Sequence, residues 1–246
     1  MSSAIRLLLT RILAETRAGP EELSSIRKGL KITDETVSSL VAQLKEAGTI
    51  TVNGGTVTLT LRQRLDAALA ALRSGADIEA VSRALTWQEF EELSAKVFEE
   101  NGFGVRRRFR FTAEGRRWEI DFLASHHPYL LLTECKRWEK GMGNQTARGI
   151  VEGHLEKAEV FSRHALEFRA RAGLEKVRRA TVVPLIVTLS ATPLDVYRRV
   201  PAVSVLTLPR FLDEFAGQLG RIAHSTLELP EYIPEAKKTR KRQKAG

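Results

Sequence analysis

An apolar run that ends in charge constrains this chain more than any other feature. Residues 129–138 (YLLLTECKRW) read as a buried strand, with Glu134 and Lys136 on one face and Cys135 on the other. A carboxylate and an ammonium group at the end of such a strand are costly to bury unless they pair or bind an ion. The run therefore predicts a polar site at the end of a core strand.

The preceding segment supplies a second carboxylate. Residues 117–124 alternate apolar and polar positions, so we expect a half-buried strand with Glu119 and Asp121 on one face. In a hairpin with the apolar run, Asp121 faces Glu134 and Lys136. Two carboxylates suit a hard cation such as Mg²⁺, which polarises a phosphate and activates water, while a lysine stabilises developing charge. This pattern favours phosphodiester cleavage over a structural ion pair.

These residues resemble the PD-(D/E)xK nucleases, and within them the Mrr-type restriction endonucleases and the archaeal Holliday-junction resolvases. The resemblance covers about residues 86–215. It rests on the helix TWQEFEELSAKVFEENGF (86–103), on EIDF (119–122) and on LLTECKRW (131–138). It implies a restriction-endonuclease-like α/β/α sandwich with a mixed central sheet, a DNA endonuclease activity, and Mg²⁺ or Mn²⁺ as cofactor.

The same resemblance assigns roles to individual residues. Asp121, Glu134 and Glu91 are expected to bind the metal and take part in catalysis, and Lys136 is expected to position the nucleophile. Glu91 follows Phe90 in the pattern that the family uses to place a helical glutamate, and Glu92 is the fallback. Ile120-Asp121 stands where the family motif has Pro-Asp, a departure that many members share.

The helix expected to carry Glu91 is amphipathic. Its apolar residues recur at steps of three and four, and Gly102 follows as a C-terminal cap. Glu91 and Glu92 flank the apolar stripe, and two solvated helix charges are the alternative interpretation. Glu119 is a further candidate ligand, although it could equally pair with an arginine across the hairpin.

Positive charge is concentrated in two places. The net charge is +9, but residues 236–246 (AKKTRKRQKAG) carry six cationic side chains, which leaves about +3 elsewhere. We expect residues 226–246 to form a basic disordered tail. A second cluster flanks the hairpin turn expected at residues 113–115, next to the metal site, and is expected to contact DNA phosphates. It comprises Arg106, Arg107, Arg108 and Arg110, together with Arg116 and Arg117 on the other side of the turn.

Residues 1–60 form a separate unit. Helices are expected at 4–17, 20–28 and 34–47, followed by a hairpin whose turn is marked by Asn53-Gly54. Three helices and a β-wing resemble a winged helix-turn-helix domain. The outward residues of its third helix could enter a major groove, and the alternative is a module for dimerisation or domain packing. They are Thr36, Ser39, Gln43 and Lys45.

The rest of the chain completes an α/β fold. Residues 61–85 are expected to form a helical linker broken near Gly75, and residues 86–225 the nuclease domain. The glycines at 141–143 are expected to open a connector into a helix over the sheet. Buried strands are expected at 181–189 and 202–206, with a closing helix at 209–219.

Composition bounds the class of protein. A single cysteine excludes a disulfide framework, and no apolar run approaches the roughly 20 residues of a membrane span, so we expect a cytoplasmic protein that contacts DNA and no membrane. The five histidines show no metal-ligand spacing and are expected on surfaces. The sequence is compatible with a homodimer. The alternative function is a non-catalytic winged-helix DNA-binding protein on a degenerate nuclease scaffold.

Overall fold

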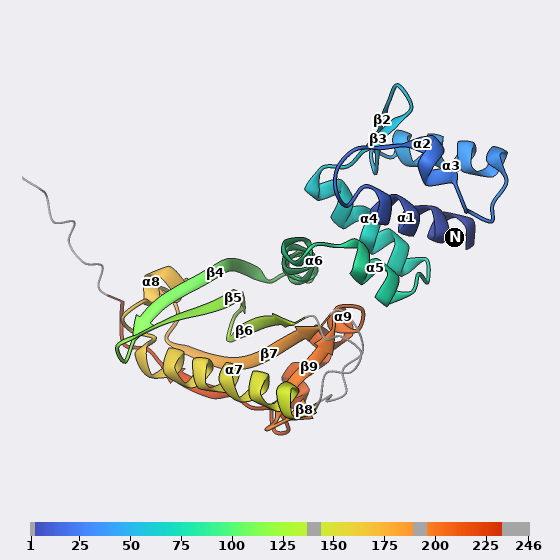
Figure 1. Ribbon diagram of the computed structural model, residues 1–246. Helices are drawn as coiled ribbons and strands as arrows, with labels where there is room; N and C mark the ends of the chain where they lie inside the picture. The colour runs from blue at the N-terminus through green and yellow to red at the C-terminus, as the bar shows by residue number, and fades with distance from the viewer. Residues whose placement is uncertain (1–2, 137–143, 189–195, 233–246) are drawn as a thin grey trace, which may run out of the picture.

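A mixed sheet with helices on both faces forms the lower lobe of the molecule in Figure 1, and the N-terminal helices lie in a second lobe above it. The computed structural model describes residues 3–136, 144–188 and 196–232. The connector glycines at 141–143 and the basic residues from 233 onward lie outside the described residues. Within the described part, no helix has the length and apolar character that a membrane span needs.

The sheet has the strand order β4-β5-β6-β7-β9-β8, and β10 pairs with β7. β4, β5 and β6 are antiparallel, whereas β6, β7 and β9 run parallel. Residue 226 is wrong as the start of the expected tail, because Thr226 to Glu228 belong to β10. The strands are β4 (Gly104–Ala113), β5 (Arg116–His126), β6 (Tyr129–Lys136), β7 (Arg179–Thr188), β8 (Val196–Tyr197), β9 (Val200–Ser204) and β10 (Ser225–Glu228).

The two faces of the sheet are covered by different helices (Figure 1). On one face, α6 (Trp87–Glu100) and α9 (Leu208–Glu214), followed by a short 3-10 helix (Phe215–Gln218), share a core with the N-terminal helices. On the other face, α7 (Asn144–His164) and α8 (Arg169–Ala172) pack against the sheet. The α/β/α arrangement expected from the sequence is confirmed.

Helix α6 forms where the sequence predicts it. Thr86 caps its N-terminus in a capping box with Glu89, and Gly102 follows the helix with φ +82°. The predicted apolar stripe is buried. This stripe fixes the rotation of α6, and with it the position of Glu91 beside the sheet.

Part-way along the β4–β5 hairpin, the side chains change the face of the sheet toward which they point. Arg107 pairs in register with Phe122, and both lie on the α6 side of the sheet. Two residues further along β4, Phe109 pairs with Ile120, and both lie in the core under α7. Strict alternation would have kept all four side chains on one face. The exchange therefore occurs between these two pairs.

Arg108 and Asp121 occupy the register position where the faces exchange. Arg108 has φ +50°, a left-handed conformation that is uncommon for a residue with a side chain. The strict alternation predicted for residues 117–124 is wrong from Asp121 onward, since Phe122 lies on the α6 side. Glu119 is exposed and paired with Arg110. Asp121 thus lies at the exchange itself, where it reaches β6.

The N-terminal unit contains a three-stranded sheet of order β1-β3-β2 beside three helices. The third helix lies as predicted and is capped by Thr33, but the helix expected at 20–28 is shorter and follows a strand. The hairpin turn is Gly54-Gly55, one residue later than expected, because Asn53 pairs with Thr56. The elements are α1 (Ser3–Glu15), β1 (Glu21–Glu22), α2 (Leu23–Arg27), α3 (Asp34–Glu46), β2 (Thr51–Asn53) and β3 (Thr56–Thr58).

Residues 61–85 are a structural part of the core and not a linker laid between two domains. They form α4 (Leu61–Arg73) and α5 (Ile78–Ala84), which pack against α1, with the expected break at Gly75. Buried Arg64 forms an ion pair with Glu89 of α6 and donates to Thr16 Oγ1 at 2.8 Å. The remaining Arg64 hydrogen bonds reach the carbonyl oxygens of Leu13 at 3.2 Å and Ala84 at 2.8 Å. One guanidinium therefore joins α1, α5 and α6.

We expect Arg64→Met to lower the free energy of unfolding by about 3–5 kcal/mol, because it leaves the Glu89 carboxylate buried without its partner. Urea unfolding followed by circular dichroism measures the change. Arg62→Met is the matched control, since Arg62 lies on the same helix with a side chain that is 89% exposed. Equal losses in the two variants would contradict a bridging role for Arg64.

Candidate active site

Asp121 is attached to the strand that carries Glu134. Its Oδ2 accepts a hydrogen bond of 2.7 Å from the backbone N–H of Cys135, the residue next to Glu134. Asp121 directly follows Ile120, the last residue of β5 before the side chains change faces. This change of face allows the Asp121 carboxylate to reach the Cys135 N–H. The structure thus brings together the two carboxylates that the sequence predicted would meet.

The Asp121 carboxyl is electrostatically unfavourable as an anion. Burial and the charge of Glu134 raise its pKa to about 6, against an ordinary value of 3.8. The Cys135 N–H and Lys136 stabilise the anion, but they do not offset these two effects. A cation placed between the carboxylates would relieve this repulsion.

Glu134 is buried, yet its carboxylate is compensated on both oxygens. Lys136 Nζ lies 2.8 Å from Oε1, and Lys157 Nζ of α7 lies 2.7 Å from Oε2. His154 Nδ1 is 3.7 Å from Oε2. Burial acts to raise the pKa of Glu134, but the surrounding cationic groups outweigh it and the pKa lies below its usual range.

His154 is not the surface residue that the sequence suggested. Its side chain is 1% exposed, and burial lowers its pKa to about 4, so the ring is neutral at pH 7. Nε2 lies 2.9 Å from the Leu132 carbonyl oxygen, which fixes Nε2 as the donor. Nδ1 is a buried acceptor directed toward Glu134, and no described residue gives it a hydrogen bond. Among the described residues, it is therefore the two lysines that neutralise Glu134 at neutral pH.

Of the two candidate glutamates on α6, Glu91 faces the site. Its charge acts on Asp121 and on Arg108, and burial is the largest cause of its raised pKa. Glu92 instead forms an ion pair with Arg107 at 2.7 Å. The structure therefore separates the two residues that the sequence left as alternatives.

The donor set fits a hard divalent cation, since Asp121 and Glu134 are two carboxylates close enough for the charge of Glu134 to raise the pKa of Asp121. Three protein ligands were expected, with Glu91 as the third. Among the described residues, however, no group of three or more histidine, cysteine, aspartate or glutamate side chains is close enough to hold an ion. Glu91 acts on the site by its charge, and a cation here would have two protein carboxylates.

Comparison with known families agrees with this geometry. Residues 82–183 match the Mrr catalytic-domain model, described as a restriction endonuclease. This chain carries a restriction-endonuclease-like domain. The matched residues include α6, β4, β5, β6 and α7, which together supply every side chain of the candidate site. No curated protein sequence matches the chain.

Several solved structures are distantly similar. Protein VC1899 from Vibrio cholerae is 13% identical, with a TM-score of 0.38 over 90% of this chain and 58% of that one. The restriction endonuclease FokI is 14% identical, with a TM-score of 0.38 over 89% of this chain and 45% of that one. The small subunit of the heterodimeric restriction endonuclease R.BspD6I is 15% identical, with a TM-score of 0.29 over 66% and 82%.

In the restriction-endonuclease-like domain, the arginines of β4 are less available for contact with DNA phosphates than the sequence suggested. Arg107 is paired with two glutamates of α6, and Arg110 with Glu119. The guanidinium of Arg106 lies against Gly173, where a methyl group would overlap it. Arg108 is the member of the cluster whose charge acts on Glu91. The hairpin turn after Ala113 is remote from the site, about five residues or 16 Å along β5 from Asp121.

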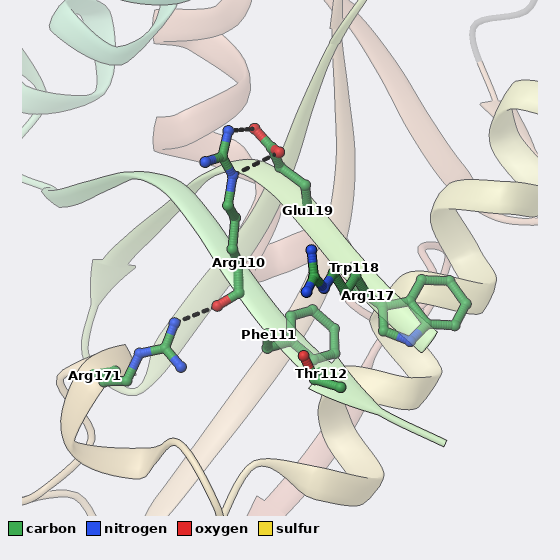
Figure 2. Close-up of a pocket in the computed structure, with 7 residues that line it drawn as sticks. All are labelled: Arg110, Phe111, Thr112, Arg117, Trp118, Glu119 and Arg171. Atoms are coloured by element: carbon green, nitrogen blue, oxygen red, sulfur yellow. Dashed lines mark hydrogen bonds and ion pairs between the residues drawn. The ribbon is translucent and has the colours of Figure 1, made fainter. Parts of the chain in front are cut away.

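A pocket lies on the outer side of this hairpin (Figure 2). In this pocket, Arg110 and Glu119 form an ion pair at 2.8 Å. Arg171 of α8 donates a hydrogen bond to the Arg110 carbonyl oxygen. Phe111 and Trp118 line it as well. Because Asp121 and Glu134 are absent from its lining residues, this pocket is not the candidate active site.

The outward residues predicted for α3 lie as expected on the helix. Ser39, Gln43 and Lys45 are exposed, and Thr36 is half-buried. Thr36 bonds through its hydroxyl to the capping residue Thr33 at 2.8 Å. Their contact with DNA remains a prediction.

Two residues of the site, His154 and Lys157, were missed from the sequence. A signal for His154 was present, because it continues the buried stripe of α7 that contains Val151, Ala158 and Phe161. A histidine in an apolar stripe has to find a polar partner in the core. Lys157 borders this stripe, and nothing in its spacing distinguishes it from a surface lysine.

We expect Asp121→Asn to stabilise the metal-free protein by about 1–3 kcal/mol at pH 7.5, because it removes a carboxylate whose pKa is raised on folding. The folded pKa of about 6 exceeds the ordinary 3.8. The difference between variant and wild type should therefore be absent below pH 4 and grow to its full size above pH 6.

Urea unfolding in EDTA across this pH range tests the expectation. The surface variant Glu119→Gln is the control, and its difference from wild type should not follow the same pH course. An Asp121→Asn protein no more stable than wild type at pH 7.5 would show that the carboxylate is not destabilising.

Proposed function

We propose that this chain is a metal-dependent DNA endonuclease of the restriction or DNA-repair and recombination type. The observation that carries the proposal is the meeting of Asp121 and Glu134 beside Lys136, in a domain that matches a restriction endonuclease model. A purely structural ion pair would account for the presence of Glu134 and Lys136. It does not explain a second carboxylate whose ionised form is unfavourable.

Asp121 and Glu134 would hold Mg²⁺ or Mn²⁺ at this place. When bound, the cation would polarise the scissile phosphate and lower the pKa of an attacking water. Asp121 is oriented for this role by the Cys135 N–H. The protein thus supplies a fixed pair of oxygen donors at the edge of a core strand.

Lys136 is proposed to orient the nucleophile and to stabilise negative charge on the phosphoryl oxygens. Glu134 raises the pKa of its ammonium group against the effect of burial, so that Lys136 is charged at neutral pH. Glu91 would assist by its charge beside Asp121, and Arg108 by contacting a DNA phosphate. Arg108 suits this role because its backbone is held in a strained conformation at the site.

We expect wild-type protein to cleave labelled plasmid or branched DNA with Mg²⁺ or Mn²⁺ and not in EDTA. Asp121→Ala and Lys136→Ala should each lose at least about 100-fold in rate, since each removes a charge that acts in the transition state. Asp213→Asn and Lys96→Met are controls that change the same residue types outside the candidate site.

DNA binding by a folded wild-type protein that cleaves no DNA with either metal would contradict the enzymatic proposal. That result would favour the alternative, a DNA-binding protein on a nuclease scaffold that has lost activity. Light scattering would separate a monomer that nicks one strand from a homodimer that cuts two. The plasmid and branched arms distinguish duplex from junction substrates.

The N-terminal unit is proposed to be a winged-helix DNA-binding domain, with α3 as the helix that contacts DNA. Three helices beside a small antiparallel sheet support this proposal, as does the exposed polar face of α3. Packing of one domain against another is the competing role for such a module.

We expect Lys45→Ala to weaken DNA binding and to reduce the slope of log affinity against log salt by about one, the loss of one phosphate contact. Gln43→Ala should weaken binding without changing this slope. Fluorescence anisotropy at several salt concentrations in EDTA measures both. The control is Lys176→Ala, an exposed lysine of the loop before β7. Identical isotherms for Lys45→Ala and wild type would contradict the DNA-binding role of α3.

A further inference from the structure

The candidate site contains one lysine more than the strand motif supplies. Lys157 comes from α7 and lies 2.7 Å from Glu134 Oε2. Lys136 lies 2.8 Å from the other oxygen, Oε1. Each oxygen of the carboxylate expected to bind a cation is therefore already paired with an ammonium group.

The two lysines lie on different sides of Glu134. Lys136 is paired with Oε1, and its charge also acts on Asp121. Oε2 is on the α7 side, between Lys157 and the buried ring of His154. A divalent cation held by both carboxylates would thus add two charges within a few ångströms of two ammonium groups. Such like charges repel strongly in a partly buried site.

Lys136 belongs to the same strand as Glu134, whereas Lys157 comes from the neighbouring helix α7. Its flexible side chain is anchored on α7 and remains 23% exposed, so the ammonium can turn outward into water. Among the described residues, Lys157 is the lysine or arginine paired with Oε2. Departure of Lys157 therefore leaves this oxygen open to another cation, while Lys136 stays paired with Oε1.

We propose that Lys157 and a divalent cation compete for Glu134, so that Lys157 acts as a tethered cation that lowers the metal affinity of the free protein. This inference rests on the proposed function, since it concerns the same site. It gives Lys157 a role that differs from that of Lys136. Removing Lys157 should make metal binding tighter, whereas removing a residue that merely orients Glu134 should make it weaker.

Mn²⁺ titration at pH 7.5 without DNA, followed by the electron paramagnetic resonance signal of free Mn²⁺, tests this competition. Lys157→Met should bind Mn²⁺ at least about tenfold more tightly than wild type. Lys157→Arg keeps the charge and should stay within about twofold of wild type. Asp121→Ala identifies binding at this site, because it should lose this Mn²⁺.

Lys96→Met is the matched control. Lys96 is a helical lysine in an ion pair with Asp66, and its side chain is 24% exposed, close to the value for Lys157. Its replacement should leave the Mn²⁺ affinity unchanged. If Lys157→Met does not fold, as judged by circular dichroism, Lys157→Gln takes its place in the titration.

The outcomes separate the two proposals. Wild type that binds Mn²⁺ through Asp121, with an uncharged Lys157 variant that binds it equally or less tightly, overturns the competition and leaves the nuclease proposal intact. Absence of Asp121-dependent Mn²⁺ binding in wild type and variant alike overturns both. Tighter binding in Lys157→Met or Lys157→Gln, with Lys157→Arg like wild type, supports the competition.

Discussion

The exchange of faces at Arg108 and Asp121 is the constraint on which the candidate site depends. On β5, Trp118 and Ile120 lie in the core under α7, whereas Phe122, the next residue of this alternating series, lies in the core under α6. A regular strand would commit Asp121 to one face of the sheet. Because the alternation breaks there, its carboxylate reaches the backbone of Cys135 and the charge of Glu134. The left-handed backbone of Arg108, opposite Asp121 in register, is part of the same distortion.

Charge compensation differs between the two carboxylates at this point. Glu134 is stabilised by a lysine on each oxygen, whereas Asp121 has a raised pKa. Folding therefore maintains one unfavourable anion, which is typical of sites where function and stability conflict. A bound divalent cation would favour ionised Asp121, and at Glu134 it would meet Lys157. The metal-free site is thus stable at one carboxylate and strained at the other.

The N-terminal helices are coupled to the site through α6. Arg64 joins α1 and α5 to Glu89, and Glu89 also completes the capping box at the start of α6. Two residues later, Glu91 acts on Asp121. A structural change in the N-terminal helices would therefore act on α6, the helix that carries Glu91 of the candidate site. The shared apolar core makes this connection continuous.

The sequence by itself determined the helices with clear caps and stripes, the strands β5, β6, β7 and β9 of the central sheet, and the strand residues Asp121, Glu134 and Lys136. These signals are local, since periodicity and capping depend on near neighbours in the chain. Only the tertiary structure decided that Glu91 and not Glu92 faces the site, that Arg107 and Arg110 of β4 are paired with glutamates, and that His154 and Lys157 belong to the site. Those facts depend on how α6 and α7 dock on the sheet and on one break in strand alternation, and contacts between distant segments leave no periodic pattern in the sequence.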